Sequence, residues 1–394
     1  MKNISSYLLL LLLLVGCKED YDSPFVSPNS GFLVVEGVIN SGQGRTSIKL
    51  SRTAKLENQL LKVQHEKGAS VKVEGEDNSS YGLNETSEGN YTANNLNLNN
   101  AVKYRLHIRT LTGKEYVSDY ATAQASPPID SITWKMEEGG VQLYLNTNNI
   151  LNNTRYYQWD YTETWEVKSQ FASMLKFQVF KDRQNRDSFS IAYRDNVNFG
   201  IDSSIYKCWQ SNESNELLIG SSAQLERDFI YLPIAFVPGG SEKLSLLYSI
   251  NIRQYGLSKE GYEFLEKIKK NTEQLGSIFD AQPGELKGNI RCITDPSEQV
   301  VGFVNICNVS EKRIFISAQD VGGWNFFPVT CSTVSLPNNS DSIRKYMSGL
   351  TPTLPSTYAT PPTNPPVISS FEAAANVCVD CTVRGTNIKP VFWP

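Results

Sequence analysis

Residues 47–52 read Ser-Ile-Lys-Leu-Ser-Arg, and this short stretch is the clearest indication of a β-rich fold. Apolar and polar side chains alternate along it, as they do in a strand with one face in a core and the other in water. Residues 32–39, just upstream, are rich in Val and Ile, and residues 40–44 contain the turn formers Asn and Gly. Together these segments predict two β-strands joined by a tight turn.

Alternation of the same kind recurs downstream. Segments 69–75, 103–109 and 115–118 each repeat it, and turns containing Gly or Asn separate them. About seven short strands with turns between them are typical of an immunoglobulin-like sandwich. We therefore predict an N-terminal Ig-like β-sandwich over residues 31–125, which ends before Ser126-Pro127-Pro128.

A second β-rich, sandwich-like domain is expected over residues 126–336. Tyr157, Trp159 and Tyr161 alternate along one predicted strand, which favours a buried sheet face over an exposed sugar-binding surface. The clearest helical pattern is an insertion at about residues 259–275, where Ser258 is a good N-cap. The predicted fold is therefore mainly β, with one helical insertion.

The last part of the chain differs in composition. Residues 337–370 are rich in Pro, Thr and Ser, which predicts an extended loop without a core. Residues 371–394 contain Cys378, Cys381 and several aromatic side chains. We expect this C-terminal segment to dock on the body of the protein and to be tethered there by a disulfide.

Cysteine usage points to an oxidising compartment. Apart from Cys17, the even number of cysteines predicts up to three disulfides, with the pairing left open. The candidates are Cys208, Cys292, Cys307, Cys331, Cys378 and Cys381. Cys378 and Cys381 form a CxxC, which would suit a redox pair or half a zinc site. The two histidines, His65 and His107, lie in strand-like segments far from it, so we favour structural cystines and expect no metal or other cofactor.

The amino terminus predicts a lipid anchor. Lys2 is followed by an apolar run over residues 7–15, and Leu14-Val15-Gly16-Cys17 closes it. A basic start, a short apolar core and small residues before a cleavage site describe a secretory signal, and the cysteine makes it a lipoprotein signal. Residues 1–17 are thus the signal, Cys17 is the acylated residue, and residues 18–30 are a tether.

The net charge and the sequence motifs restrict which classes of function we expect. The net charge of −4 argues against nucleic acid, which requires a basic face. The sequence contains neither HExxH nor GxSxG, so no catalytic residue is assigned and a non-enzymatic role is expected. A glycosidase-like pair of carboxylates needs no fixed local motif, so a surface hydrolase acting on glycan or peptide stays an alternative.

Several stretches resemble a Bacteroidetes outer-membrane lipoprotein family of unassigned function. They are residues 33–37 (Leu-Val-Val-Glu-Gly), 48–53, 68–71, 248–250, 253–255, 271–276, the Cys378-x-Asp380-Cys381 motif and residues 385–393. Arg384-Gly385 replaces the doubled glycine common in that family. Lys18-Glu19-Asp20 likewise resembles the surface-export signal of Bacteroidetes lipoproteins.

The resemblance implies a location and a partner. It implies an outer-membrane, lipid-anchored protein that faces the cell exterior. Genes of the family commonly lie beside SusC-like TonB-dependent transporters, which implies a non-enzymatic accessory or ligand-capture partner in nutrient uptake. The ligand, whether small molecule, glycan or peptide, is not implied. An adhesin or structural envelope protein is a further alternative, because the fold alone does not fix function.

Overall fold

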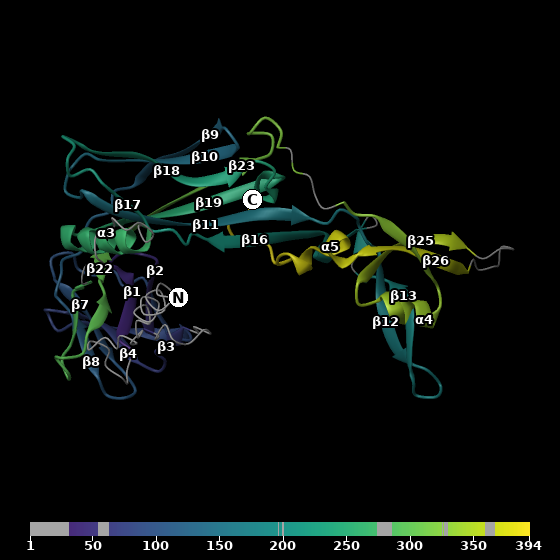
Figure 1. The fold of residues 1–394 in the computed structure, drawn as a ribbon, viewed down its shortest axis with the longest axis horizontal. Helices are drawn as coiled ribbons and strands as arrows, with labels where there is room; N and C mark the ends of the chain where they lie inside the picture. Colours follow the sequence, from purple (N-terminus) through teal and green to yellow (C-terminus); the bar gives the residue numbers. More distant parts are fainter. Residues whose placement is uncertain are drawn as a thin grey trace, which may run out of the picture.

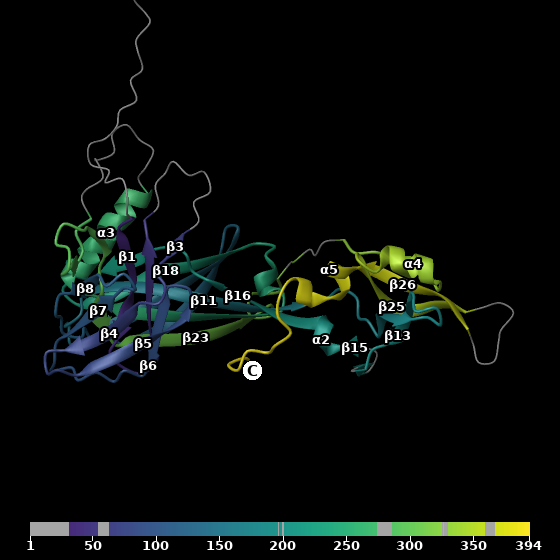
Figure 2. The same ribbon diagram turned by 90° about the horizontal axis from the view of Figure 1, so that it is seen from below.

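The computed structural model describes residues 31–53, 63–195, 197–198, 201–273, 286–324, 326, 330–358 and 367–394. The chain is mainly β, as predicted, and forms three parts (Figure 1). The N-terminal sandwich and the central sandwich lie one against the other. A smaller distal lobe projects from one end of the central sandwich (Figure 2).

The N-terminal sandwich is a strongly curled sheet. Its strands are β1 (Leu33–Asn40), β2 (Arg45–Arg52), β3 (Gln64–His65), β4 (Ser70–Gly75), β5 (Ser80–Ser87), β6 (Asn90–Asn94), β7 (Tyr104–Arg109) and β8 (Glu115–Ser118). Strands β20 (Ile290–Cys292), β21 (Val300–Gly302) and β22 (Asn305–Cys307) complete it: β20 pairs with β8, while β21 and β22 pair with β1 in parallel. The nearly closed sheet surrounds a core that includes Ile48, Leu106 and Tyr116.

These three late strands correct the predicted boundary. Residues 126–336 were expected to form the second domain alone, but residues 290–307 belong to the N-terminal sheet. The reason is that β1 and β8 would otherwise be edges with unpaired backbone donors and acceptors. Strands β20 to β22 are only three residues long each. Their local sequence therefore does not indicate which distant strands they pair with.

The central sandwich packs two sheets face to face. One sheet contains β9 (Ile129–Glu137), β10 (Gly140–Asn149) and β18 (Asp228–Pro238). The other contains β11 (Tyr156–Lys168), β16 (Lys207–Glu213), β17 (Leu218–Ser221), β19 (Leu247–Gly256) and β23 (Val309–Ser317), with η2 (Glu242–Leu244) beside them. Tyr157 and Trp159 are buried in the core between the sheets, and the Trp159 indole donates to Oε1 of Gln254 at 2.8 Å. The expectation that this aromatic face is core is confirmed.

The predicted helix is α3 (Lys259–Glu273), and it lies between the two sandwiches (Figure 1). The Ser258 Oγ accepts a hydrogen bond from the Gly261 amide at 3.0 Å, as the N-cap assignment predicted. Gly261 permits a close approach, since a Cβ there would lie 2.2 Å from Oδ1 of Asn305 on β22. Residues 274–275 of the predicted helix lie outside the described residues.

The distal lobe is built from two separate parts of the chain. The first supplies β12 (Leu175–Lys181), β13 (Asp187–Tyr193), β14 (Val197–Asn198), β15 (Ile201–Asp202) and α2 (Ser203–Tyr206). The second supplies β24 (Thr333–Pro337), α4 (Ser340–Tyr346), β25 (Leu350–Tyr358), β26 (Ile368–Ala375), α5 (Asn376–Val379) and η3 (Cys381–Val383). The order β24-β26-β25 makes β26 the central strand of its sheet.

The prediction of a structureless loop over residues 337–370 is therefore wrong for its described part. Strand β25 contains Pro352 and Pro355, and its register with β26 shifts at both. Proline is tolerated there because β25 is an edge strand and the irregularities remove the need for a ladder donor. Residues 359–366, which hold four further prolines of that stretch, lie outside the described residues.

In the described part of the chain the cysteines form two disulfides, Cys208–Cys381 and Cys331–Cys378. The two cysteines of the CxxC thus bind different partners, and the C-terminal segment is tethered as predicted. Cys292 and Cys307 are free thiols, so the third possible disulfide does not form. Both are buried in the N-terminal sandwich, where a thiol packs as a small apolar side chain, and burial raises the pKa of Cys307 to about 12.

Candidate functional site

The residues that the sequence assigns to the anchor lie outside the described residues. These are the acylation site Cys17 and the surface-export residues Lys18, Glu19 and Asp20. The described helices include none with the length and hydropathy that a bilayer crossing requires. The two histidines lie on strands, as expected: His65 on β3 and His107 on β7, where its Nδ1 is 2.7 Å from Oε1 of Glu74.

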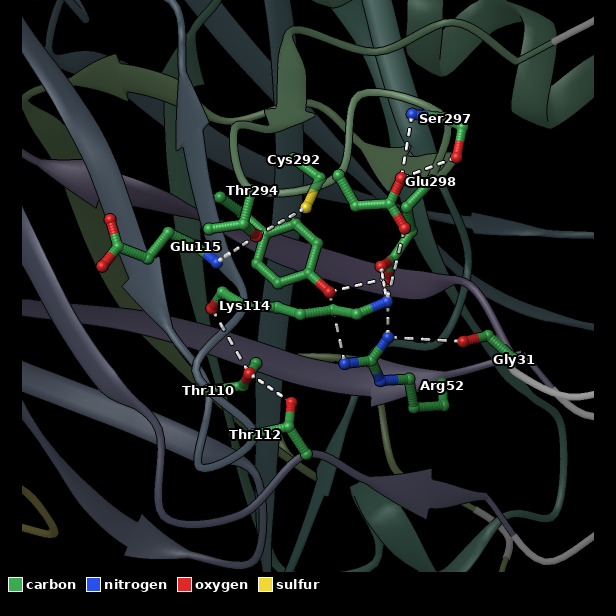
Figure 3. Close-up of polar contacts among 12 residues, drawn as sticks. Gly31, Arg52, Thr110, Thr112, Lys114, Glu115, Cys292, Thr294, Ser297 and Glu298 are labelled. Carbon is green, nitrogen blue, oxygen red and sulfur yellow. Dashed lines mark hydrogen bonds and ion pairs between the residues drawn. The ribbon is translucent and has the colours of Figure 1, made fainter.

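A polar cluster surrounds Glu298 in the loop between β20 and β21 (Figure 3). Its side chain is only 6 % exposed. Tyr116 donates its hydroxyl to Oε1 at 2.6 Å, Arg52 donates to the same oxygen at 3.0 Å, and Lys114 donates to Oε2. Arg52 also binds Glu66 through Nε at 2.7 Å. The cluster joins β2, β8 and the β20–β21 loop.

The acidic and basic side chains in this cluster form ion pairs with one another. Burial opposes ionisation of Glu298, but hydrogen bonds from Lys114, Tyr116 and Arg52 outweigh it, so the pKa of Glu298 lies below its ordinary value. The hydrogen bond to Glu298 raises the pKa of Lys114, while burial and the same carboxylate raise that of Tyr116. At neutral pH the carboxylate is ionised and accepts hydrogen bonds from three side chains, so the cluster fixes the loop.

A cleft lies where α3 meets the N-terminal sandwich. It has a volume of about 690 Å³. We call it the junction cleft, and its lining includes Lys103, Asp119, Tyr120, Gln124, Glu260, Glu263, Phe264, Lys267, Asn289, Phe303 and Asn305. Ligand pockets commonly form where two domains meet.

The junction cleft combines aromatic walls with charged rims. Phe264 and Phe303 pack with ring centroids 5.7 Å apart, and Phe264 is buried. Tyr120, which also lines the cleft, is 37 % exposed, with the Arg105 guanidinium 4.8 Å from its ring centroid. Lys267 and Glu263 come from α3. Such a lining suits a ligand with an apolar part and polar groups of either charge.

Among the described residues, no group of three or more His, Cys, Asp or Glu side chains is arranged to bind a metal ion. Neither the cluster around Glu298 nor the junction cleft was predicted from the sequence. The local signal for the cluster is weak, since Asp295 and Glu298 are simply two acids in a short segment between strands. The cleft residues are spread from Lys103 to Ile306, so no local motif could have brought them together.

Comparison with known families decides the assignment. The profile of a family described as Domain of unknown function (DUF4249) matches residues 18–313, which is more than half of the chain. The chain belongs to the DUF4249 family. This confirms the predicted membership of a family of unassigned function. A search of curated proteins finds no match to this chain.

The DUF4249 match also places the candidate site within the family. It runs from just after Cys17 into β23, so it includes every residue that lines the junction cleft and the Glu298 cluster. Strands β24 to β26 of the distal lobe lie beyond it. The cleft therefore lies within the matched region, whereas the second part of the distal lobe lies outside it.

Proposed function

We propose that this DUF4249 chain is a surface-exposed outer-membrane lipoprotein that serves as a non-enzymatic ligand-capture or accessory partner of a TonB-dependent transporter. The observation that carries the proposal is the junction cleft, which offers a ligand aromatic walls and charged rims. Capture of a ligand needs such a surface and no bond-making groups.

The amino-terminal sequence supports the location. Leu14-Val15-Gly16-Cys17 supplies the acylation site, and Lys18-Glu19-Asp20 supplies the export-like triplet of Bacteroidetes lipoproteins. The tether of residues 18–30 spans at most about 45 Å when fully extended. It leads directly to Gly31, whose carbonyl accepts a hydrogen bond from Arg52 at 3.4 Å. The N-terminal sandwich is thus the part nearest the anchor along the chain.

The test is a pull-down of the tagged full chain from solubilised outer membranes of its native host. We expect a TonB-dependent barrel to be recovered with the chain. The Cys17→Ala variant should leave the membrane fraction and lose the barrel. Repeated recovery of an acylated chain without any barrel would contradict the proposal.

A second variant separates ligand capture from association with the barrel. Tyr120→Ala removes an exposed ring from the junction cleft without touching the core. The proposal expects this variant to retain the barrel and to reduce uptake of the nutrient that supports growth through that transporter. A Tyr193→Ala variant, which loses an exposed ring of the distal lobe, is the matched control and should leave uptake unchanged.

A further inference from the structure

The outer face of the sheet β9-β10-β18 carries exposed aromatic side chains. Inward side chains of these strands, such as Leu143 on β10, fill the central core. On β18, Phe229, Tyr231 and Phe236 point outward and are 48 %, 46 % and 44 % exposed. The solvated face of an antiparallel sheet is normally polar, and contiguous exposed apolar surface marks a binding site. We call this surface the aromatic face.

Two of its rings are held in a fixed arrangement. Tyr144 on β10 stacks with Tyr231 on β18, with ring centroids 5.1 Å apart and planes 4° apart. The Tyr144 hydroxyl donates to Glu137 on β9, and Nζ of Lys135 lies 5.1 Å from the Tyr144 ring centroid. A ring pair fixed from both sides loses little conformational entropy when it binds a ligand.

Amide and hydroxyl side chains run alongside the rings. In the sheet register, Asn148 lies opposite Phe229, and Asn146 lies opposite Tyr231. Beyond them, Thr133 on β9 lies opposite Tyr144 and is exposed. The face therefore has a row of aromatic side chains next to a row of small hydrogen-bonding side chains.

The face is electrically balanced. Among the outward positions paired in register in these described strands, Lys135 and Glu137 are the charged residues, and their charges cancel. Pro233 and Pro238 interrupt the row of backbone N–H donors along β18. Addition of a strand from another chain at this edge is therefore disfavoured. A ligand is instead expected to bind on the outer face of the sheet.

From this juxtaposition we infer that the aromatic face is a binding site for neutral glycans. A sugar ring has an apolar C–H face, which packs on an aromatic ring, and a rim of hydroxyls, which hydrogen-bond to amides and hydroxyls. A neutral ligand also suits a face without net charge, whereas a phosphate or an acidic peptide would require a basic one.

The site is distinct from the junction cleft. The sheet β9-β10-β18 lies on the side of the central sandwich opposite the N-terminal sandwich (Figure 1). The face thus points away from the part of the chain that follows the tether. The inference concerns the purified chain and requires neither the lipid anchor nor a transporter, so it can fail or hold independently of the proposed function.

The experiment is affinity electrophoresis of the purified full chain in gels containing soluble starch, dextran, arabinoxylan or galactomannan, with anionic alginate for comparison. We expect at least one neutral polysaccharide to retard the chain. Tyr231→Ala and Phe229→Ala should each weaken that interaction about tenfold, which corresponds to about 1.4 kcal/mol. Tyr231→Phe, which keeps the ring, should bind as the parent does.

Tyr193→Ala on the distal lobe is the control for loss of an exposed tyrosine elsewhere, and unchanged thermal unfolding verifies the fold of each variant. The inference is overturned if none of the four neutral polysaccharides retards the chain, or if retardation survives Tyr231→Ala. Binding of alginate alone would also overturn it. So would a Tyr231→Ala variant that loses the transporter in the pull-down but keeps its glycan affinity, since the face would then dock a protein.

Discussion

The N-terminal sandwich and the distal lobe both join segments far apart in the sequence, but they do so differently. The N-terminal sandwich recruits β20 to β22 by strand pairing and fixes their loop with the buried Glu298 cluster, while its cysteines stay thiols. The distal lobe has a small cluster of buried residues that includes Ile205 and Val379, and both disulfides hold its C-terminal part. In this molecule, disulfides therefore hold the part that has the smallest buried core.

The largest effect expected from this comparison is loss of the Cys208–Cys381 disulfide. Replacing both cysteines with Ala opens a link between residues 173 positions apart. The chain-entropy model gives a destabilisation of about 5 kcal/mol for such a loop. Limited proteolysis should then cleave the C-terminal segment before either sandwich. Cys292→Ala, which removes a thiol instead, is the control and should leave the cleavage pattern intact; similar patterns for both would refute the comparison.

The next largest effect is expected from Glu298→Gln in the N-terminal sandwich. The substitution removes the carboxylate charge at the centre of a buried ionic cluster. Arg52 keeps its ion pair with Glu66, and Lys114 keeps the more distant Asp295 at 3.8 Å. Such a loss typically costs about 3 kcal/mol. Urea unfolding followed by a probe in the N-terminal sandwich measures it. A midpoint equal to that of the parent would show that the cluster does not stabilise this sandwich.

A smaller, pH-dependent effect distinguishes ionic from covalent links. The pKa of Glu298 is lowered in the folded chain, so its contribution is present above the ordinary glutamate pKa of about 4.3 and is lost as the pH falls through the folded value. The difference in unfolding free energy between the parent and Glu298→Gln should therefore shrink as the pH falls below the ordinary glutamate pKa. A difference that is constant with pH would exclude an ionic origin.

The smallest effect is expected at an exposed ion pair in the same sandwich. Lys49 and Glu36 lie 3.5 Å apart with side chains about half exposed. Lys49→Ala should change the unfolding free energy by no more than about 0.5 kcal/mol. Thermal unfolding at low and high salt measures it. A loss comparable to that of Glu298→Gln would show that burial is not what sets the two pairs apart.

Local chemistry was sufficient to predict the elements that it controls. The alternation at residues 47–52 predicted β2, and Ser258 predicted the start of α3, because a strand face and an N-cap are set by neighbouring residues. The buried stripe of Tyr157 and Trp159 was likewise predictable from its period. The tethered C-terminal segment followed from its cysteines.

Features that depend on distant partners were not predictable. The pairing of Ile290–Cys292 with β8 depends on a partner far away in the sequence, and Pro352 lies in a strand only because that strand is an edge itself. The junction cleft needs α3, β22 and the end of β8 brought together in space. The exposure of Tyr231 was not predictable either, since which face of a sheet meets solvent depends on the second sheet.

The mass of the mature chain purified from host membranes reports directly on the lipid anchor. The account predicts an amino terminus at Cys17 that carries acyl chains, since every part of the proposed surface role depends on that anchor. An unmodified amino terminus, or a chain recovered from the culture medium, would contradict it.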